Sequence, residues 1–172
     1  KRVKEHPLRQ LFWECTLRCN LNCRHCGSDC KKTAHTPDMP KEDFLRVLDS
    51  VAAKTDPHKV FVVVTGGEPL MRSDLEECGR AIYERGFPWG MVTNGLFLTR
   101  ERLDALMAAG LHTATISLDG FATDHNWMRG NPHSFDQAVN AIRMMAQTPD
   151  LVFDVVTCVN KHSLLRLEEL KD

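Results

Sequence analysis

Three cysteines within eight residues are the part of this chain whose residue types and spacing are best suited to chemistry. Cys19, Cys23 and Cys26 form a C-x3-C-x2-C pattern directly after an apolar stretch. Three thiols cannot all pair with one another, but together they can hold a soft metal centre. A structural zinc ion takes four protein ligands, here the three thiols with His25 or another histidine. An iron–sulfur cubane held by three thiolates keeps one iron open for a substrate. The pattern therefore predicts a metal centre, with an open cluster and zinc as the alternatives.

Composition limits the classes of protein to which the chain can belong. Its 172 residues can form one domain with a core, and 42% are hydrophobic and 26% charged. The formal net charge of −1 argues against nucleic acid or an anionic membrane as the main partner. We expect no membrane span and no signal peptide. Seven cysteines, an odd number that includes the triplet, favour metal binding in a reducing compartment, here the cytoplasm.

Five alternations of strand and helix are predicted to position the triplet. The apolar and β-branched runs that predict strands are 8–15, 60–65, 89–93, 113–118 and 153–159. The segments predicted as helices are 40–52, 73–85, 99–109, 134–147 and 164–170. Ser73, Thr99 and Ser134 are the expected N-caps, and Gly110 is expected to end the third helix. The run from Val60 to Thr65 suits a strand buried on both faces. The order predicts an α/β fold: a partial (β/α) TIM-like barrel, or a doubly wound sheet if it lies open.

Each unusual short motif follows one of the predicted strands. The triplet comes after the first, Gly66-Gly67-Glu68-Pro69 after the second, Asn94-Gly95 after the third, and Ser117 to Asp119 ends the fourth. The carboxyl ends of parallel strands lie at one rim, where ligands bind in such folds. Residues up to about a hundred positions apart should therefore face one site.

These motifs, in this order along nearly the whole chain, resemble the radical S-adenosylmethionine (radical SAM) superfamily. The layout that includes His125-Asn126-Trp127-Met128-Arg129-Gly130 is similar to the branch that modifies peptides and proteins, with its sulfatase-maturing enzymes and their SPASM-domain relatives. The resemblance implies a barrel of which residues 1–172 supply about five βα units. We therefore expect a single truncated core domain, with a sixth unit and any SPASM-type domain in a longer parent protein that carries the activity.

The resemblance also implies the cofactors and the reaction. Cys19, Cys23 and Cys26 would hold a 4Fe-4S cluster whose open iron binds S-adenosylmethionine (SAM). An external donor of the flavodoxin or ferredoxin type would supply the electron that cleaves SAM. The 5′-deoxyadenosyl radical would then abstract hydrogen from a peptide or protein substrate. The alternative is an iron–sulfur module for electron transfer or sensing that never cleaves SAM.

Five residues are implied in binding the methionyl part of SAM. Gly66 and Gly67 let the backbone approach the ligand without a Cβ between them. Glu68 can accept a charge-assisted hydrogen bond from the ammonium group, and Pro69 stiffens the loop. Arg129 offers the planar fork that suits the methionyl carboxylate.

Five further residues are expected to contact SAM, four of them at the nucleoside. Ser117 and Asp119 are hydroxyl binders placed for the ribose, and Asn94 is a further SAM contact. His25 precedes the third cysteine, where the family commonly has an aromatic residue against the adenine. Thr157, in the fifth predicted strand, would also meet the adenine. No catalytic base is identifiable.

The other four cysteines divide into two groups. Cys15, Cys78 and Cys158 are expected in the core, because they fall on predicted strands or on the inward face of a helix. Cys30 follows the triplet by four residues. It is left open whether Cys30 lines the site or meets another cysteine.

Overall fold

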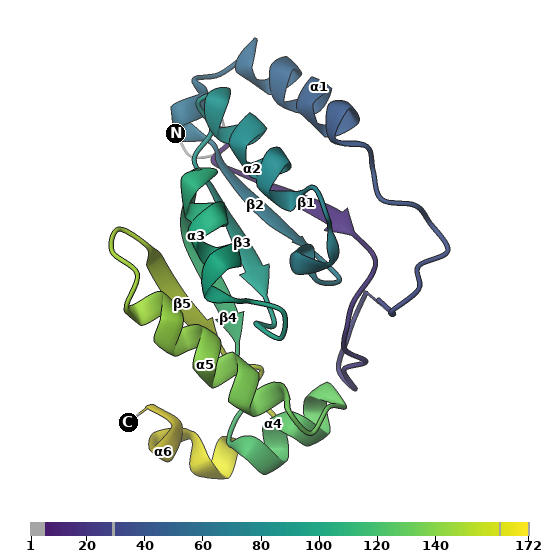
Figure 1. The fold of residues 1–172 in the computed structure, drawn as a ribbon, viewed down its shortest axis with the longest axis vertical. Coiled ribbons are helices and arrows are strands. Elements are labelled where there is room, and N and C mark those ends of the chain that lie inside the picture. Colours follow the sequence, from purple (N-terminus) through teal and green to yellow (C-terminus); the bar gives the residue numbers. More distant parts are fainter. Residues whose placement is uncertain (1–5, 29, 162, 172) are drawn as a thin grey trace.

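The structure is a computed structural model that describes residues 6–28, 30–161 and 163–171. Five parallel strands form one sheet in the order β1-β2-β3-β4-β5. Their bounds are β1 Gln10–Thr16, β2 Phe61–Gly66, β3 Trp89–Thr93, β4 Leu111–Ser117 and β5 Val152–Val156. Strands alternate with helices throughout, so the predicted partial β/α barrel is confirmed (Figure 1).

The helices α1, α2, α3 and α5 cover one face of this sheet (Figure 1). The helix bounds are α1 Lys41–Ala52, α2 Leu75–Glu84, α3 Arg100–Ala108, α4 Ala122–Arg129, α5 Ser134–Ala146 and α6 Leu167–Lys171. Short 3-10 turns occur at η1 Pro57–Lys59, η2 Pro69–Met71 and η3 Ser163–Arg166. Among the described residues, no helix has both the length and the apolar character that crossing a bilayer requires.

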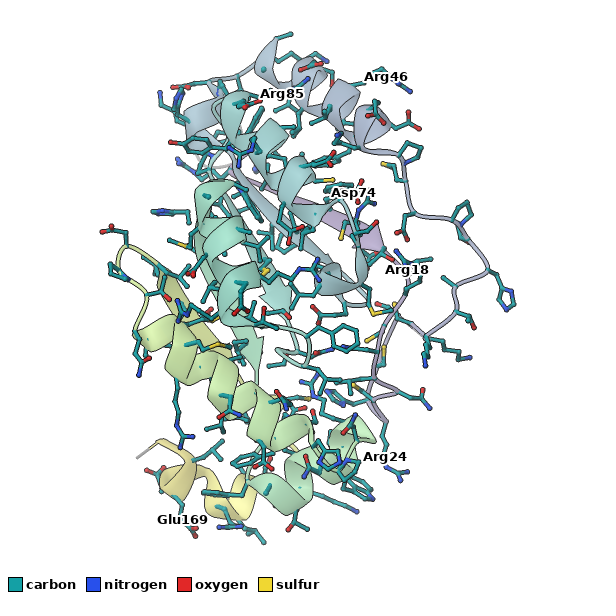
Figure 2. The ribbon with its side chains drawn as sticks, in the orientation of Figure 1. Arg18, Arg24, Arg46, Asp74, Arg85 and Glu169 are labelled. Carbon is teal, nitrogen blue, oxygen red and sulfur yellow. The ribbon has the colours of Figure 1, made fainter. Side chains whose placement is uncertain are left out.

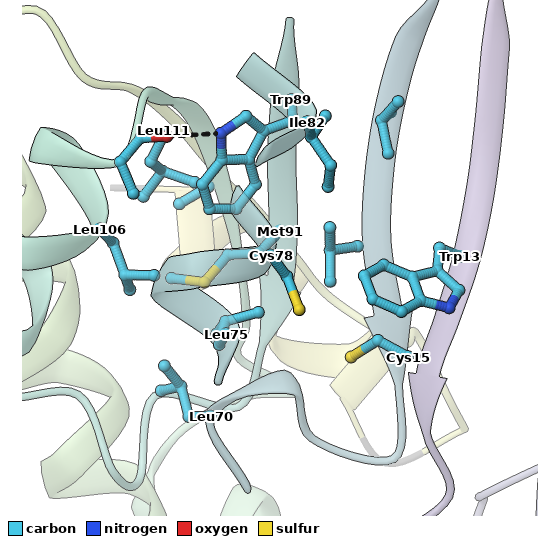
Figure 3. Packing of buried hydrophobic residues seen from close by; sticks show 14 of the residues in the cluster. Trp13, Cys15, Leu70, Leu75, Cys78, Ile82, Trp89, Met91, Leu106 and Leu111 are labelled. Carbon is cyan, nitrogen blue, oxygen red and sulfur yellow. Dashed lines mark hydrogen bonds between the residues drawn. The ribbon is translucent and has the colours of Figure 1, made fainter. Parts of the chain in front are cut away.

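The hydrophobic core lies between the sheet and these helices. Trp89 and Met91 of β3 are buried in it, and the Trp89 indole N–H donates to the Ala109 carbonyl oxygen at 3.2 Å (Figure 3). Gly79 of α2 lies against the Trp89 ring, which a Cβ at that position would overlap. Trp13 of β1 stacks on a ring from α1 at 4.0 Å between centroids. The core thus fixes the strands whose ends carry the motifs.

The opposite face of the sheet is not buried as the sequence predicts. Val62 and Val64 point to the core and are fully buried, whereas Phe61 and Val63 are half-buried on the other face. The prediction that this strand is buried on both faces is therefore wrong. The reason is that the covering helices lie on one side of the sheet. The other side lines an open cavity of about 760 Å³, to which Phe12 of β1 also contributes.

The helix boundaries follow the predicted caps at one of three places. Thr99 accepts a hydrogen bond from the Arg102 N–H at 3.2 Å, and Gly110 ends the segment with φ of 89°, as predicted. Ser73 is not a cap, because α2 begins at Leu75 with the preceding aspartate at the N-cap position. Ser134 is not a cap either, because it is the first residue of α5.

Two further predictions are corrected. The segment that carries His125 and Arg129 lies outside the helices predicted from the sequence, but it forms the helix α4. Cys158 is exposed and lies beyond β5, which ends at Val156, so it is not a core residue. The predicted burial of Cys15 and Cys78 is confirmed.

Candidate functional site

The cysteine triplet lies on the long segment between β1 and α1, which passes the carboxyl ends of the strands and reaches α4 (Figure 1). Arg24 fastens this loop to α4 (Figure 2). Its backbone N–H donates to the Met128 carbonyl at 2.9 Å, and its Nε donates to the Trp127 carbonyl at 3.0 Å. The guanidinium also lies 4.8 Å from the centre of the Trp127 ring. Two segments about a hundred residues apart are therefore held together at the site.

N–H groups lie beside the sulfur atoms of two of the three cysteines. Cys19 is buried, and its Sγ lies 3.5 Å from the Leu21 N–H and 3.9 Å from the Asn94 side-chain nitrogen. The Sγ of Cys23 lies 3.8 Å from Nη1 of Arg129. Cys26 is exposed. Burial raises the pKa of the Cys19 thiol to about 11, which disfavours its thiolate form at neutral pH.

Glu68 joins the ends of β2 and β3. The side chain is 1% exposed. Its Oε1 accepts from the Leu70 N–H at 3.1 Å and from the Thr93 hydroxyl at 2.6 Å, and its Oε2 accepts from the Asn94 N–H at 2.8 Å. Burial raises the pKa of Glu68, while these hydrogen bonds oppose the rise. The carboxylate therefore fixes the strand ends relative to each other, a role that the sequence did not indicate.

The two glycines before Glu68 allow a close approach between backbones. A Cβ at Gly66, whose φ is 135°, would clash with Thr16, and a Cβ at Gly67 would clash with Arg18. The Gly67 N–H donates to the Thr16 carbonyl at 2.8 Å. The motif thus packs directly against the start of the cysteine loop, and the buried Pro69 then opens the turn η2.

Asn94 connects the end of β3 to the same loop. Its side-chain nitrogen donates to Oδ1 of Asn20 at 2.8 Å and lies beside Cys19. Its Oδ1 accepts from the Leu96 N–H at 2.9 Å, which fixes the amide orientation. The residue after the third strand is therefore placed at the thiols, as the strand order predicts.

Asp119 and Arg129 form a buried ion pair at the end of β4. Nε of Arg129 donates to Oδ2 of Asp119 at 2.6 Å, and Asp119 is 1% exposed. The other oxygen, Oδ1, accepts from the Cys158 N–H at 3.0 Å. His25 is brought here as well, with its Nε2 3.5 Å from Oδ2 of Asp119. Residues from the cysteine loop, β4, α4 and the segment after β5 thus meet at one carboxylate.

Ser117 and Thr157 lie further along the rim. Ser117 pairs with Val156 in the register between β4 and β5, and the Thr157 hydroxyl donates to the Leu118 carbonyl at 2.7 Å. These contacts place both residues at the last two strands of the sheet, whereas the cysteine loop begins at β1. The structure therefore places Asn94 and Arg129 at sulfurs of the cysteine loop, and Ser117 and Thr157 at the strand ends next to Asp119.

Comparison with known proteins identifies the family. The family model described as "Radical SAM superfamily" matches residues 13–172. The chain belongs to the radical SAM superfamily. The AdoMet-dependent heme synthase of Methanosarcina barkeri (strain Fusaro / DSM 804) is 32% identical over 157 residues, which is 91% of this chain and 44% of the relative. The PqqA peptide cyclase of Ruegeria pomeroyi (strain ATCC 700808 / DSM 15171 / DSS-3) is 35% identical over 111 residues, or 64% of this chain and 29% of the relative.

A solved structure shares the fold of this radical SAM domain. Native anSMEcpe with bound AdoMet superposes with a TM-score of 0.79 at 18% identity, over 96% of this chain and 47% of that one. The chain spans less than half the length of these curated relatives.

The thiols of the radical SAM domain fit an iron–sulfur cluster by their chemistry. Among residues 6–28, 30–161 and 163–171, no three side chains of His, Cys, Asp or Glu are gathered closely enough to hold a metal ion. A cubane binds its three thiolates at three separate irons, so it does not require them to meet at one point. Three thiols on one loop, with N–H groups beside Cys19 and Cys23, are a donor set that a cluster can use.

Sequence reasoning missed two polar residues behind the site. His125 and Ser134 are each 1% exposed, and His125 Nε2 lies 2.9 Å from the Ser134 hydroxyl oxygen. Nothing in the sequence marks them, because a histidine in a polar segment usually stays in solvent and a serine before a helix usually caps it. Cys30, whose position was left open, is buried in a small cluster with Cys19 and Leu21.

Proposed function

We propose that this chain is the SAM-binding part of a radical SAM enzyme that cleaves SAM reductively and abstracts hydrogen from a second substrate. The observation that carries the proposal is the arrival of Asn94, which follows β3, and Arg129, the last residue of α4, at the sulfurs of Cys19 and Cys23. A cofactor held by those thiols would therefore have polar groups for a second ligand directly beside it.

Cys19, Cys23 and Cys26 are the proposed ligands of a 4Fe-4S cluster, which when bound supplies the electron that breaks the sulfonium bond. The chain's own residues bind and orient SAM. Arg129 keeps its planar fork beside Cys23, where it can pair with the methionyl carboxylate. Glu68 uses three of about four carboxylate acceptor sites within the protein, so one is left for the ammonium group.

The nucleoside is assigned to residues further along the rim. Ser117, Thr157 and Asp119 lie at the β4 and β5 ends, where a ribose and an adenine would extend from the cysteine loop. His25 lies between this region and Cys26, beside Asp119. Gly66, Gly67 and Pro69 act by shaping the loop.

The open face of the sheet is the proposed place for the second substrate. Its cavity of about 760 Å³ is lined largely by apolar and aromatic side chains, with Thr115 and Asp154 as a hydrogen-bonded polar pair at 2.6 Å. An iron porphyrin is the first candidate, because such a flat apolar molecule suits this wall and the heme synthase is similar over most of the chain. A peptide or protein is the second candidate, supported by the similarity to the PqqA peptide cyclase.

The electron donor and the compartment belong to the same proposal. Reductive cleavage needs a one-electron donor, for which a flavodoxin- or ferredoxin-like protein is suited. A cluster with an open iron needs a reducing compartment such as the cytoplasm.

The test is formation of 5′-deoxyadenosine. The chain is reconstituted anaerobically with iron and sulfide, reduced with dithionite, and supplied with SAM. We expect 5′-deoxyadenosine from the wild type and from Cys158→Ser, and none from Cys23→Ala. A fully loaded parent protein, of the length of the curated relatives, that forms no 5′-deoxyadenosine would contradict the enzyme assignment and favour an electron-transfer or sensing module. Stoichiometric zinc without a brown chromophore after anaerobic purification would contradict the cluster itself.

The substrate class is tested in the same assay. Iron coproporphyrin and a mixture of short peptides are added separately. The class that raises 5′-deoxyadenosine above the level with SAM alone is supported.

A further inference from the structure

A buried histidine stands behind the Asp119–Arg129 ion pair. Nδ1 of His125 accepts the backbone N–H of Asp119 at 3.0 Å, and its Nε2 lies 2.9 Å from the Ser134 hydroxyl oxygen. A backbone N–H can only donate, so Nδ1 carries no proton. The neutral ring must therefore carry its hydrogen on Nε2, which donates to Ser134. The two contacts select one tautomer and one ring orientation.

His125 and Arg129 hold Asp119 from the same helix. They are four residues apart on α4, and such residues lie on one helix face. The histidine accepts a hydrogen bond from the backbone N–H of Asp119, and the arginine donates one to its carboxylate. The aspartate is thus fixed at two points, and the direction of the Arg129 guanidinium is fixed with it.

The outer end of Arg129 reaches the cysteine loop. With Nε engaged by Asp119, Nη1 is directed at Cys23 Sγ, at 3.8 Å. A small rotation of Asp119 would carry the guanidinium away from the sulfur, because the two groups are joined by a short hydrogen bond of 2.6 Å. The chain of contacts Ser134–His125–Asp119–Arg129 therefore ends at a proposed cluster ligand.

We propose that His125 and Ser134 are positioning residues of the SAM site, which hold Arg129 beside Cys23 through Asp119. The inference rests on the proposed function, since Arg129 is the residue assigned to the SAM carboxylate. In the wild type, the guanidinium is already directed when SAM arrives, so binding does not have to order it.

A purely structural role for the junction between α4 and α5 can be separated by experiment from the positioning of Arg129. Asn126 also joins α4 to α5, with its side-chain nitrogen 2.8 Å from the Pro132 carbonyl and its Oδ1 2.8 Å from the Phe135 N–H. Within the part of the chain that the structure describes, neither of these Asn126 side-chain hydrogen bonds involves Asp119 or Arg129. Asn126→Ala therefore weakens the junction between α4 and α5 without removing any of the contacts that link Ser134, through His125 and Asp119, to Arg129.

The experiment compares substitutions in the anaerobically reconstituted chain. His125→Leu removes both ring contacts, and His125→Asn keeps an acceptor that can face the Asp119 N–H. Ser134→Ala removes the hydroxyl alone. Asn126→Ala is the structural control, and His133→Leu replaces a neighbouring exposed histidine. The measurements are iron content, the dissociation constant for SAM, and the electron paramagnetic resonance spectrum of the reduced cluster with and without SAM.

We expect His125→Leu to weaken SAM binding about tenfold with iron content unchanged, since a charge-assisted contact loses its direction. His125→Asn should recover most of that loss, and Ser134→Ala should show a smaller loss in the same direction. The spectral change that SAM causes should be reduced in His125→Leu and retained in both controls.

Equal SAM affinity in wild type and folded His125→Leu would overturn the inference. An equal loss of SAM affinity in Asn126→Ala and His125→Leu would overturn it as well, since weakening of the junction between α4 and α5 would then explain the effect. If His125→Leu does not fold, Ser134→Ala decides: wild-type SAM affinity in that variant contradicts the inference. A wild type that loads iron but binds no SAM would contradict the proposed function itself, a failure visible without any variant.

Discussion

The backbone N–H of Asn94 donates to Oε2 of Glu68 at 2.8 Å, and this bond joins the loop after β2 to the loop after β3. Asn94 then places its side chain beside Cys19. The carboxylate therefore acts on the cysteine loop at a distance, through the residue that it holds.

Glu68→Gln should destabilise the domain by about 2 kcal/mol, because an amide cannot accept from donors on both sides. Whichever way the new side chain turns, an N–H group faces either Asn94 or the Leu70 and Thr93 donors. Urea unfolding at neutral pH measures the change. Glu77→Gln is the matched control, since that side chain is 72% exposed and pairs with Lys41 at the surface. It should change stability by less than about 0.5 kcal/mol. Equal values for the two substitutions would contradict the structural role of Glu68.

Acid should destabilise the domain through His125. Burial, and then the nearby Arg129 charge, lower the pKa of this histidine to about 4, and Asp119 acts in the opposite direction. The unfolded chain binds a proton below about pH 6.5, whereas the folded chain resists it down to about 4. Stability from this group is therefore present above pH 6.5 and lost as the pH falls towards 4, by about 2 kcal/mol at pH 5. Urea unfolding at pH 7 and pH 5 measures it, and His125→Asn should lose less than the wild type. The same loss in both would show that other groups are responsible.

Gly67→Ala should weaken the contact between the Gly66-Gly67-Glu68-Pro69 loop and the cysteine loop. The added Cβ would clash with the Arg18 carbonyl, a backbone group that cannot turn aside, so we expect a loss of about 1–3 kcal/mol. Gly27→Ala is the matched control, because a Cβ there meets nothing within 4 Å. Thermal unfolding of the metal-free chains compares the two. A melting temperature for Gly67→Ala as high as that of the control would show that the two loops separate easily.

Arg24→Ala should loosen the cysteine loop while leaving the core unchanged. It removes the 3.0 Å hydrogen bond to Trp127 and the guanidinium that lies over its ring. We expect global stability to fall by less than about 1 kcal/mol and iron to be lost to a chelator several times faster. Arg46→Ala, at an exposed site on α1, should keep the wild-type rate (Figure 2). Unchanged iron retention in Arg24→Ala would contradict the anchoring role of this residue.

The sequence predicts the elements whose signals are local. The third helix was predicted because Thr99 and Gly110 are strong boundary residues, and β3 was predicted because Trp89 to Thr93 is an isolated apolar run. By contrast, α4 was missed because its polar residues show no helical apolar stripe, and it buries few side chains. The prediction that both faces of β2 are buried was wrong because the sequence cannot indicate on which side of the sheet the helices lie.

In the candidate site, too, the features with local sequence signals could be predicted and those that depend on packing could not. The position of Asn94 near the thiols follows from strand order, which the sequence indicates, whereas Arg129 was expected at the site only from the family resemblance. The buried contacts of Glu68 and the pairing of Asp119 with Arg129 depend on tertiary packing, so no motif predicts them. The roles of these residues towards SAM stay predictions.

The link between Arg24 and the residues at 127 and 128 spans more than a hundred positions of sequence. Contacts of such long separation form late, since most of the intervening polypeptide must first be synthesised and compacted. During translation the three sulfurs consequently emerge on an untethered segment well before the helix that restrains them exists. Iron delivery should then succeed chiefly after the ribosome has released α4, so a nascent chain stalled before residue 122 would incorporate little.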